Sequence, residues 1–361
     1  MAEERKRQHG GRTVTRRRFL AGSGAAIAAA ATGGPLILVP GKAKASEQLV
    51  VTSWGGAYEE GIKKVFAEPF TKETGIPITT INNADLAKVK AQVTSGAVEW
   101  DVFDGIGPQI TAGAKNGYWE PVDASIVDRS DLVVPGGDTF VGVYFYGGGV
   151  CWDNKRHPDG KHPVDFKGFW DVNAYPGPRA LRARIPETLE MALIADGVEP
   201  RKLYPLDVER GFRSLDRIKP HIKKWVVPSP QTISLVQDGE VNFSYTYISR
   251  VVGAERAGSP IGFSYKQTLN SMEYFAVVKG SKNREAAMKF IAFCLRPDRQ
   301  AAFADLLSFT PIARKGYQLA SPEGKKHMAD LESPNNGIID DQWWRDHFDE
   351  LTKRFTEWTI T

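Results

Sequence analysis

Short apolar runs alternate with helically spaced segments between Leu49 and Asn116, and this alternation is the strongest constraint on the fold. The runs at 49–53, 76–82 and 100–106 predict buried strands, and the segments at 57–72, 84–95 and 108–116 predict helices. A strand–helix–strand order that repeats in this way is typical of a mostly parallel sheet with helices on both faces. The first third of the chain therefore predicts an α/β unit.

A long β-prone run, Phe140–Trp152, follows and contains Gly147, Gly148 and Gly149, which predicts a crossing strand with a bend. Beyond it the same patterns predict strands at 179–185, 222–227, 241–248, 261–265 and 272–278, and helices at 166–172, 186–196, 207–219, 232–238, 285–295, 298–307 and 340–355. The 361 residues are 42% hydrophobic and 25% charged, which suits two globular units of ordinary size. A second α/β unit is therefore expected.

Residues 1–45 have the features of a removable export signal. Thr15-Arg16-Arg17-Arg18-Phe19-Leu20 is similar to a twin-arginine export signal, and the segment 19–41 carries no charge. Ala43-Lys44-Ala45 is a small-x-small cleavage pattern, so cleavage is expected after Ala45. A membrane anchor is the alternative, but a segment rich in Ala and Gly inserts only weakly into a membrane. The mature protein is expected in the periplasm.

Charge is distributed unevenly between this leader and the rest of the chain. The leader holds nine of the 47 Lys and Arg residues and two of the 43 Asp and Glu residues, so the mature part is mildly acidic. A mildly acidic body argues against a nucleic-acid partner. Cys151 and Cys294 could pair in an oxidising compartment, but Cys294 ends an apolar helical run, which favours a buried thiol.

Motifs of catalysis are weak throughout. The segment Asp104–Ile110 contains glycines after a strand, but Ile110 replaces the third glycine of a dinucleotide loop and Pro108 removes an amide. No Walker loop and no His-Glu-x-x-His occurs, and the histidines of the mature part are scattered. The sequence predicts no enzyme, no cofactor and no bound metal.

Aromatic side chains stand at the ends of the expected strands, some of them beside acids. Trp54 and Tyr58 flank the first loop, Tyr247 lies near a strand end, and Glu273 precedes Tyr274. In α/β sheets the strand ends form the ligand crevice. Aromatic faces together with a carboxylate suit an organic ammonium ion. Core packing is the alternative for each of these aromatic residues.

Several segments resemble the periplasmic solute-binding proteins of ABC importers, specifically the spermidine/putrescine-binding family. They are Ser53–Tyr58, Trp100–Val102, Pro176–Leu181, Leu203–Asp207, Gln237–Val241, Glu273–Gly280 and Ala286–Ile291, in the family's order over nearly all of the mature chain. The resemblance implies two α/β lobes with a mostly parallel sheet in each and a ligand cleft between them. Lobe one would be 46–147 plus 266–310, and lobe two 148–265 plus 311–361.

The resemblance also implies the ligand-binding residues. Trp54 and Tyr58 match an aromatic clamp, Glu273 matches an acid that holds an amine, and Glu187 lies near a second acid of the family. Tyr247 and Phe309 stand where the family has aromatic residues. The expected function is a periplasmic receptor that binds a polyamine or other amine-bearing solute and delivers it to the permease subunits of an ABC importer. A monomer is expected.

Two alternatives remain open at this stage. A ferric-ion or other anion or metal receptor could use the tyrosine pairs Tyr144/Tyr146 and Tyr245/Tyr247, although residues two apart on a strand lie far apart for one ion. A secreted enzyme could share the fold. Coloured protein on purification would favour the first alternative, and turnover of an amine would favour the second.

Overall fold

The computed structural model describes residues 48–82 and 84–361; the predicted export signal lies outside them. The described chain is a mixed α/β structure around one curled sheet, whose main strand order is β2-β1-β3-β9-β4-β7-β5-β6. The expected α/β class is thereby confirmed.

One end of the sheet is parallel and comes from the first third of the chain. Its strands are β1 (Leu49–Ser53), β2 (Ile78–Asn82) and β3 (Val102–Ile106), with β1 paired in parallel to both others. The helices between them are α1 (Gly56–Ile62), a π-helical turn (Lys63–Ala67), α2 (Glu68–Thr74), α3 (Leu86–Ser95) and α4 (Gly107–Lys115). Asp85 caps α3 through the amide of Ala87, and Gly96 ends it in the left-handed conformation. The predicted order of elements is therefore confirmed here.

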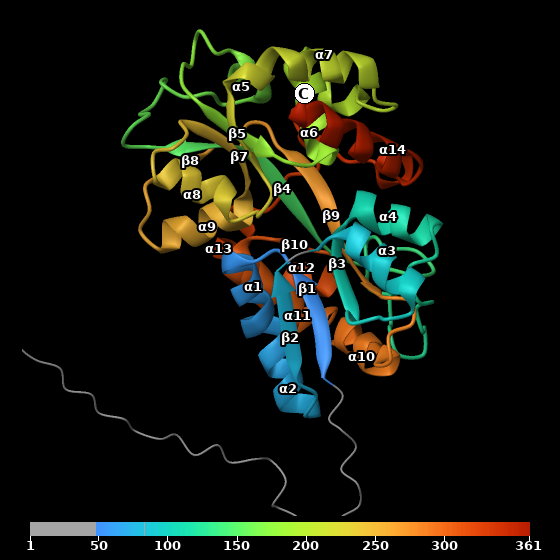
Figure 1. Ribbon diagram of the computed structural model, residues 1–361. Helices are drawn as coiled ribbons and strands as arrows, with labels where there is room; N and C mark the ends of the chain where they lie inside the picture. The colour runs from blue at the N-terminus through green and yellow to red at the C-terminus, as the bar shows by residue number, and fades with distance from the viewer. Residues whose placement is uncertain (1–47, 83) are drawn as a thin grey trace, which may run out of the picture. The chain divides into compact units, whose positions relative to one another are not determined.

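Two long strands occupy the middle of the sheet. β4 (Val141–Asp153) and β9 (Leu269–Val277) run antiparallel to each other, and β9 also pairs antiparallel with β3 (Figure 1). Gly148 of β4 lies under the ring of Tyr245, where an added Cβ would come within 2.1 Å of the hydroxyl oxygen. A residue with a side chain would therefore displace that tyrosine.

The other end of the sheet is again parallel. It contains β5 (Arg179–Arg182), β6 (Ile222–Val226) and β7 (Phe243–Tyr247), and β8 (Ile261–Phe263) pairs with β4. The helical segments around it are α5 (Phe166–Trp170), α6 (Ile185–Ala195), Pro200–Lys202, α7 (Val208–Ile218), Lys219–His221, α8 (Gln231–Gln237) and α9 (Ile248–Arg256). Helix α9 was not predicted, because it begins directly after β7 without a turn residue between them.

The C-terminal part of the chain packs over both parallel regions. It forms α10 (Arg284–Cys294), α11 (Pro297–Leu307), β10 (Thr310–Pro311), α12 (Arg314–Leu319), α13 (Pro322–Lys325), β11 (Gly337–Ile338) and α14 (Asp341–Ile360). Helix α14 lies against α4 and α6 (Figure 1). The hydroxyl of Thr111 donates to the Asp341 carbonyl at 2.8 Å, and Trp344 donates to Glu190 at 2.7 Å. These bonds tie α14 to elements from both ends of the sheet.

Both cysteines are buried and free, which agrees with the interpretation of Cys294 as a core thiol. Among residues 48–82 and 84–361, no helix is long and apolar enough to cross a membrane. The same residues hold no group of three or more His, Cys, Asp or Glu side chains arranged for a metal ion.

Candidate ligand-binding site

A cavity of about 380 Å³ lies where several strands end. Trp54 follows β1, Ile106 ends β3, Arg182 ends β5 and Tyr247 ends β7, so the carboxyl ends of parallel strands converge on it. Its full lining is Trp54, Tyr58, Ile106, Tyr144, Tyr146, Arg182, Arg184, Ser229, Tyr247, Ser249, Arg250, Glu273 and Phe309. The wall is thus rich in aromatic rings and in charge.

The structure brings five of the six predicted site residues to this cavity, namely Trp54, Tyr58, Tyr247, Glu273 and Phe309. The sixth, Glu187, is buried just behind the wall, in contact with Tyr146, Arg184 and Tyr247, all three of which line the cavity. Phe309 packs on Tyr58 and Tyr144 with ring centroids 5.7 Å and 4.3 Å away. That these residues bind solute stays a prediction.

Glu273 belongs to a pair of buried carboxyl groups. Trp54 Nε1 donates to Glu273 Oε1 at 2.8 Å, and the Glu273 carboxyl is close enough to Asp104 for the charge of Asp104 to raise the pKa of Glu273. Asp104 also accepts from the Tyr58 hydroxyl at 2.6 Å, and that hydroxyl contacts the hydroxyl of Tyr144. Asp104 and Glu273 are 0% and 3% exposed. Two buried carboxyl groups this close to each other share at least one proton at neutral pH.

Burial shifts the titration of both acids upward. Loss of water raises the pKa of Asp104 to about 7, against hydrogen bonds from Tyr58, Glu273 and Trp54 that lower it. Burial, and then the neighbouring Asp104 charge, raise the pKa of Glu273 well above its usual value. Above about pH 7 the pair therefore carries one negative charge, which suits one ammonium group.

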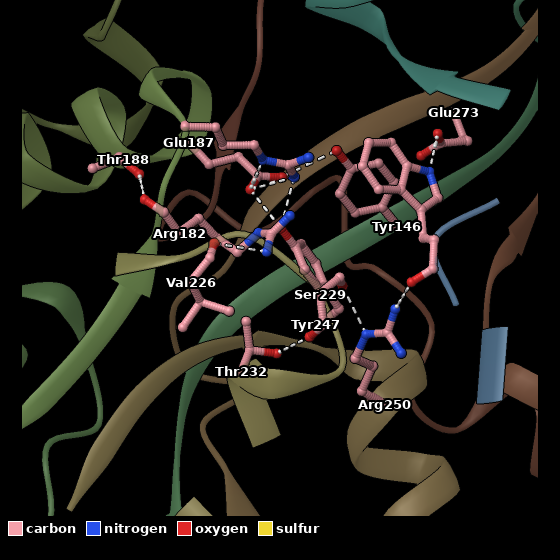
Figure 2. A network of polar contacts seen from close by, with 12 residues as sticks. Tyr146, Arg182, Glu187, Thr188, Val226, Ser229, Thr232, Tyr247, Arg250 and Glu273 are labelled. Carbon is pink, nitrogen blue, oxygen red and sulfur yellow. Dashed lines mark hydrogen bonds and ion pairs between the residues drawn. The ribbon is translucent and has the colours of Figure 1, made fainter. Parts of the chain in front are cut away.

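A second network surrounds Glu187 (Figure 2). Its carboxylate accepts from Arg184 Nη2 at 2.7 Å, from the Tyr146 hydroxyl at 3.0 Å and from the Tyr247 hydroxyl at 2.8 Å. The Arg184 guanidinium lies over the ring of Trp54, 5.5 Å from its centre. Burial opposes the charge of Arg184, but Glu187 and the tyrosine oxygens more than offset it, so the pKa of Arg184 is raised. Arg184 is thus a cation with a built-in counter-ion.

Arg182 and Arg250 are different, because their partners are neutral. Arg182 Nη1 donates to the carbonyls of Val226 and Val227, at 3.0 and 2.7 Å. Arg250 donates to Ser229 Oγ at 2.8 Å and to the carbonyls of Trp54 and Gly55, at 2.8 and 3.2 Å. Within the part of the chain that the structure describes, neither arginine has a carboxylate within ion-pair distance.

Both arginines are deeply buried cations. Arg182 is 4% exposed and Arg250 is 6% exposed. Burial lowers the pKa of Arg182, and it lowers the pKa of Arg250 to about 10, with a further lowering by the charge of Arg182. A buried charge without a counter-ion is unfavourable, so the pair forms a place for an anionic group.

These arginines were not predicted as site residues, and Tyr144 and Tyr146 were considered only as ligands of a metal ion. A cation near the carboxyl end of a predicted strand is a usable signal, since Arg182 and Arg184 lie in the last four residues of the predicted strand 179–185 and Arg250 lies two residues after the predicted strand 241–248. The tyrosine hydroxyls are divided between two separate carboxylates: that of Tyr58, which also contacts the Tyr144 hydroxyl, donates to Asp104, whereas those of Tyr146 and Tyr247 donate to Glu187. They therefore do not converge on one point as ligands of a single ferric ion would.

A larger cavity of about 1500 Å³ adjoins the first and shares Trp54, Ile106, Arg182 and Arg184 with it. Its other walls come from the start of α3, from α4 and from α14, including Phe348 and Phe355. The inner cavity therefore continues toward the C-terminal helix.

An α/β fold with charged and aromatic side chains around a cavity at the strand ends is suited to binding a small polar solute. Residues 66–331 match the family model of the bacterial extracellular solute-binding proteins. The chain belongs to this family, which comprises receptors for solutes rather than enzymes.

Similar proteins and solved structures support the assignment to this family. The chain is 33% identical to a gamma-aminobutyric acid-binding protein of Pseudomonas aeruginosa, over 87% of this chain and 91% of that protein. It is 26% identical to the spermidine/putrescine-binding periplasmic protein of Escherichia coli, over 77% and 82%. The structure of the PBP AgtB from A. tumefaciens R10 in complex with agropinic acid superposes with a TM-score of 0.82 at 30% identity, covering 87% of this chain and 99% of that one. The predicted family resemblance is confirmed.

Proposed function

We propose that this protein is the periplasmic receptor of an ABC importer for a small solute that carries both an ammonium and a carboxylate group. Glu273 and Asp104 would hold the ammonium, with Trp54 beside it. Arg182 and Arg250 would hold the carboxylate. An ω-amino acid with a short chain, such as 4-aminobutyrate, has both charges.

The observation that carries this proposal is the pair of buried arginines without a carboxylate partner in residues 48–82 and 84–361. A solute carboxylate would supply the missing counter-charge through charge-assisted hydrogen bonds. A bare polyamine would instead add positive charge beside Arg182 and Arg250. Within the predicted class of amine-bearing solutes, the charges therefore favour the amino acid over the polyamine. The gamma-aminobutyric acid-binding relative supports the same choice.

Three solutes of matched length test the proposal by calorimetric titration. They are 4-aminobutyrate, putrescine, which has a second ammonium group, and butyrate, which lacks the ammonium. We expect 4-aminobutyrate to bind at least tenfold more tightly than either of the others, since each lost charged hydrogen bond is worth about 1.5–3 kcal/mol. Putrescine binding as tightly as 4-aminobutyrate would overturn the proposal.

A matched pair of variants locates the carboxylate. Arg250→Gln removes a buried cation of the cavity, while Arg345→Gln removes a cation whose side chain is 48% exposed on α14. Affinity for 4-aminobutyrate should fall at least tenfold in the first variant and stay within twofold in the second. Equal affinities in both variants would remove Arg250 from the site.

The remaining parts of the proposal concern context. The export signal 1–45, with cleavage after Ala45, would send the chain to the periplasm as a monomer that delivers its solute to permease subunits. Residues 46–147 plus 266–310 would form lobe one and 148–265 plus 311–361 lobe two, with the antiparallel strands β4 and β9 between the two parallel regions. The solute would be released unchanged, so nuclear magnetic resonance of a long incubation should show no product.

A further inference from the structure

The site contains a second buried carboxylate that an arginine of the same chain neutralises. Glu187 is 2% exposed, and its only ion-pair partner among the described residues is Arg184. Arg184 Nε and Nη2 reach Glu187 Oε2 at 3.2 and 2.7 Å, and Nη2 also donates to the Tyr247 hydroxyl at 2.6 Å. The guanidinium is therefore held by the wall of the cavity rather than by solvent.

The backbone at Glu187 supports a functional role for this arrangement. Glu187 has φ 71° and ψ −42°, a left-handed conformation that a residue with a side chain rarely adopts. It directly follows Pro186, whose ψ of 142° is extended, before α6 continues regularly. Strained residues of this kind persist where surrounding contacts hold them, and they gather at ligand sites. Here the strain directs the carboxylate toward Tyr146, Tyr247 and Arg184.

Trp54 contacts one carboxylate directly and a second one through Arg184. Trp54 Nε1 donates to Glu273, and the Trp54 ring carries the guanidinium that is bound to Glu187. An aromatic ring near two carboxylates is suited to two cationic groups. In this chain the second cation is Arg184 itself.

We propose that Arg184 determines the specificity of the site. Its guanidinium, bound to Glu187, occupies the place that the second ammonium group of a diamine would take. This proposal rests on the proposed function, because it explains why the site would accept one ammonium group and reject two. It also makes Glu187 a positioning residue for Arg184, rather than an acid that binds the solute directly as the sequence analysis predicted.

Three variants test the role of Arg184. Arg184→Gln removes the charge but keeps an amide that can donate to Glu187, and Arg184→Lys keeps the charge without the planar fork. The double variant Arg184→Gln/Glu187→Gln also removes the carboxylate. Affinity for putrescine should rise at least tenfold in Arg184→Gln, and should remain within about threefold of wild type in Arg184→Lys and in the double variant. The gain thus requires both the loss of the cation and the presence of Glu187.

Thermal stability supplies a second readout that does not need tight binding. Arg184→Gln leaves a buried carboxylate without its cation, so the melting temperature should fall. Putrescine should restore more of this loss than butyrate does, because a ligand that binds the folded state stabilises it. Circular dichroism confirms that each variant is folded.

The outcomes separate this proposal from the previous one. A putrescine affinity of Arg184→Gln within twofold of wild type, or an equal gain in the double variant, overturns the role of Arg184. A wild-type protein that prefers putrescine to 4-aminobutyrate overturns the proposed function instead. An Arg184→Gln variant too unstable to titrate is replaced by Arg184→Lys in the thermal assay, where putrescine protection above that of wild type would contradict the proposal.

Discussion

The affinity for an ammonium-bearing solute should depend steeply on pH below about 7. Glu273 and Asp104 are buried close to each other, and burial raises the pKa of Asp104 to about 7. Below this pH both carboxyl groups are protonated and the pair is neutral. An ammonium group requires one negative charge there, so binding in acid must release one proton.

The size of the effect follows from one proton. Linkage of a single proton with a pKa near 7 weakens the affinity by about 50-fold between pH 7 and pH 5, or about 2.3 kcal/mol. Above pH 8 the affinity should level off, because the pair already carries its charge. Other titratable groups that interact with the pair are Tyr58, Tyr144, Tyr146, Cys294 and Arg184, and none of these changes its charge between pH 5 and 8.

Isothermal titration of 4-aminobutyrate at pH 5, 6, 7 and 8, in two buffers of different ionisation enthalpy, measures both the affinity and the protons released. About one proton per solute should be released at pH 5 and close to none at pH 8. Asp104→Asn, which removes the group whose pKa is about 7, should remove most of this dependence. No histidine is among the described residues that line the cavity, so titration of a cavity histidine does not explain a pH-dependent affinity. An affinity constant within twofold from pH 5 to 8 would refute the reasoning.

Four further outcomes are expected. At pH 7.5, Glu273→Gln should bind 4-aminobutyrate about 10- to 150-fold more weakly, by calorimetry, while an unchanged affinity would remove this acid from the site. Replacing Arg16 and Arg17 by Lys should leave the precursor in the cytoplasm on cell fractionation; normal periplasmic yield would contradict twin-arginine export. Small-angle scattering should give a smaller radius of gyration with saturating solute than without, if two lobes close on it. Burial raises the pKa of Asp341 to about 7, so the folded protein keeps a proton that the unfolded chain loses above about 4. Its contribution to stability should be lost as pH rises from about 4 to 7. The free energy of unfolding, measured with urea at several pH values, should therefore fall less steeply with pH in Asp341→Asn than in wild type.

Much of the fold could be predicted because buried strands and helices require apolar residues at regular spacings along the chain. The strand at Leu49–Ser53 was predicted with its observed bounds, and the long strand at Phe140–Trp152 within one residue at each end. The first run is too short for a typical helix, and the second is rich in β-branched and aromatic residues, so length and composition favour a strand. The short elements β10, β11, α12 and α13 were missed, since two to six residues form no recognisable period.

The aromatic part of the site could be predicted, but the assignment of its charges could not. Glu273 and Glu187 were both predicted as solute-binding acids, yet their surroundings differ. Glu273 meets Asp104 across the β3–β9 pairing, whereas Glu187 meets Arg184 because of its left-handed backbone. The spacing of Arg184 and Glu187 is visible in the sequence, but the direction in which the carboxylate points is not.

The sequence by itself determined the α/β order of elements, the family and the set of aromatic residues at the strand ends, because these follow from local periodicity and local motifs. Only the tertiary structure decided which charges have partners. Arg182, Arg184 and Arg250 look alike in the sequence, but one is buried against a carboxylate and the other two against neutral groups. The pairing of a buried charge depends on elements that are far apart in the chain, and so it is fixed only when the sheet brings the strand ends together.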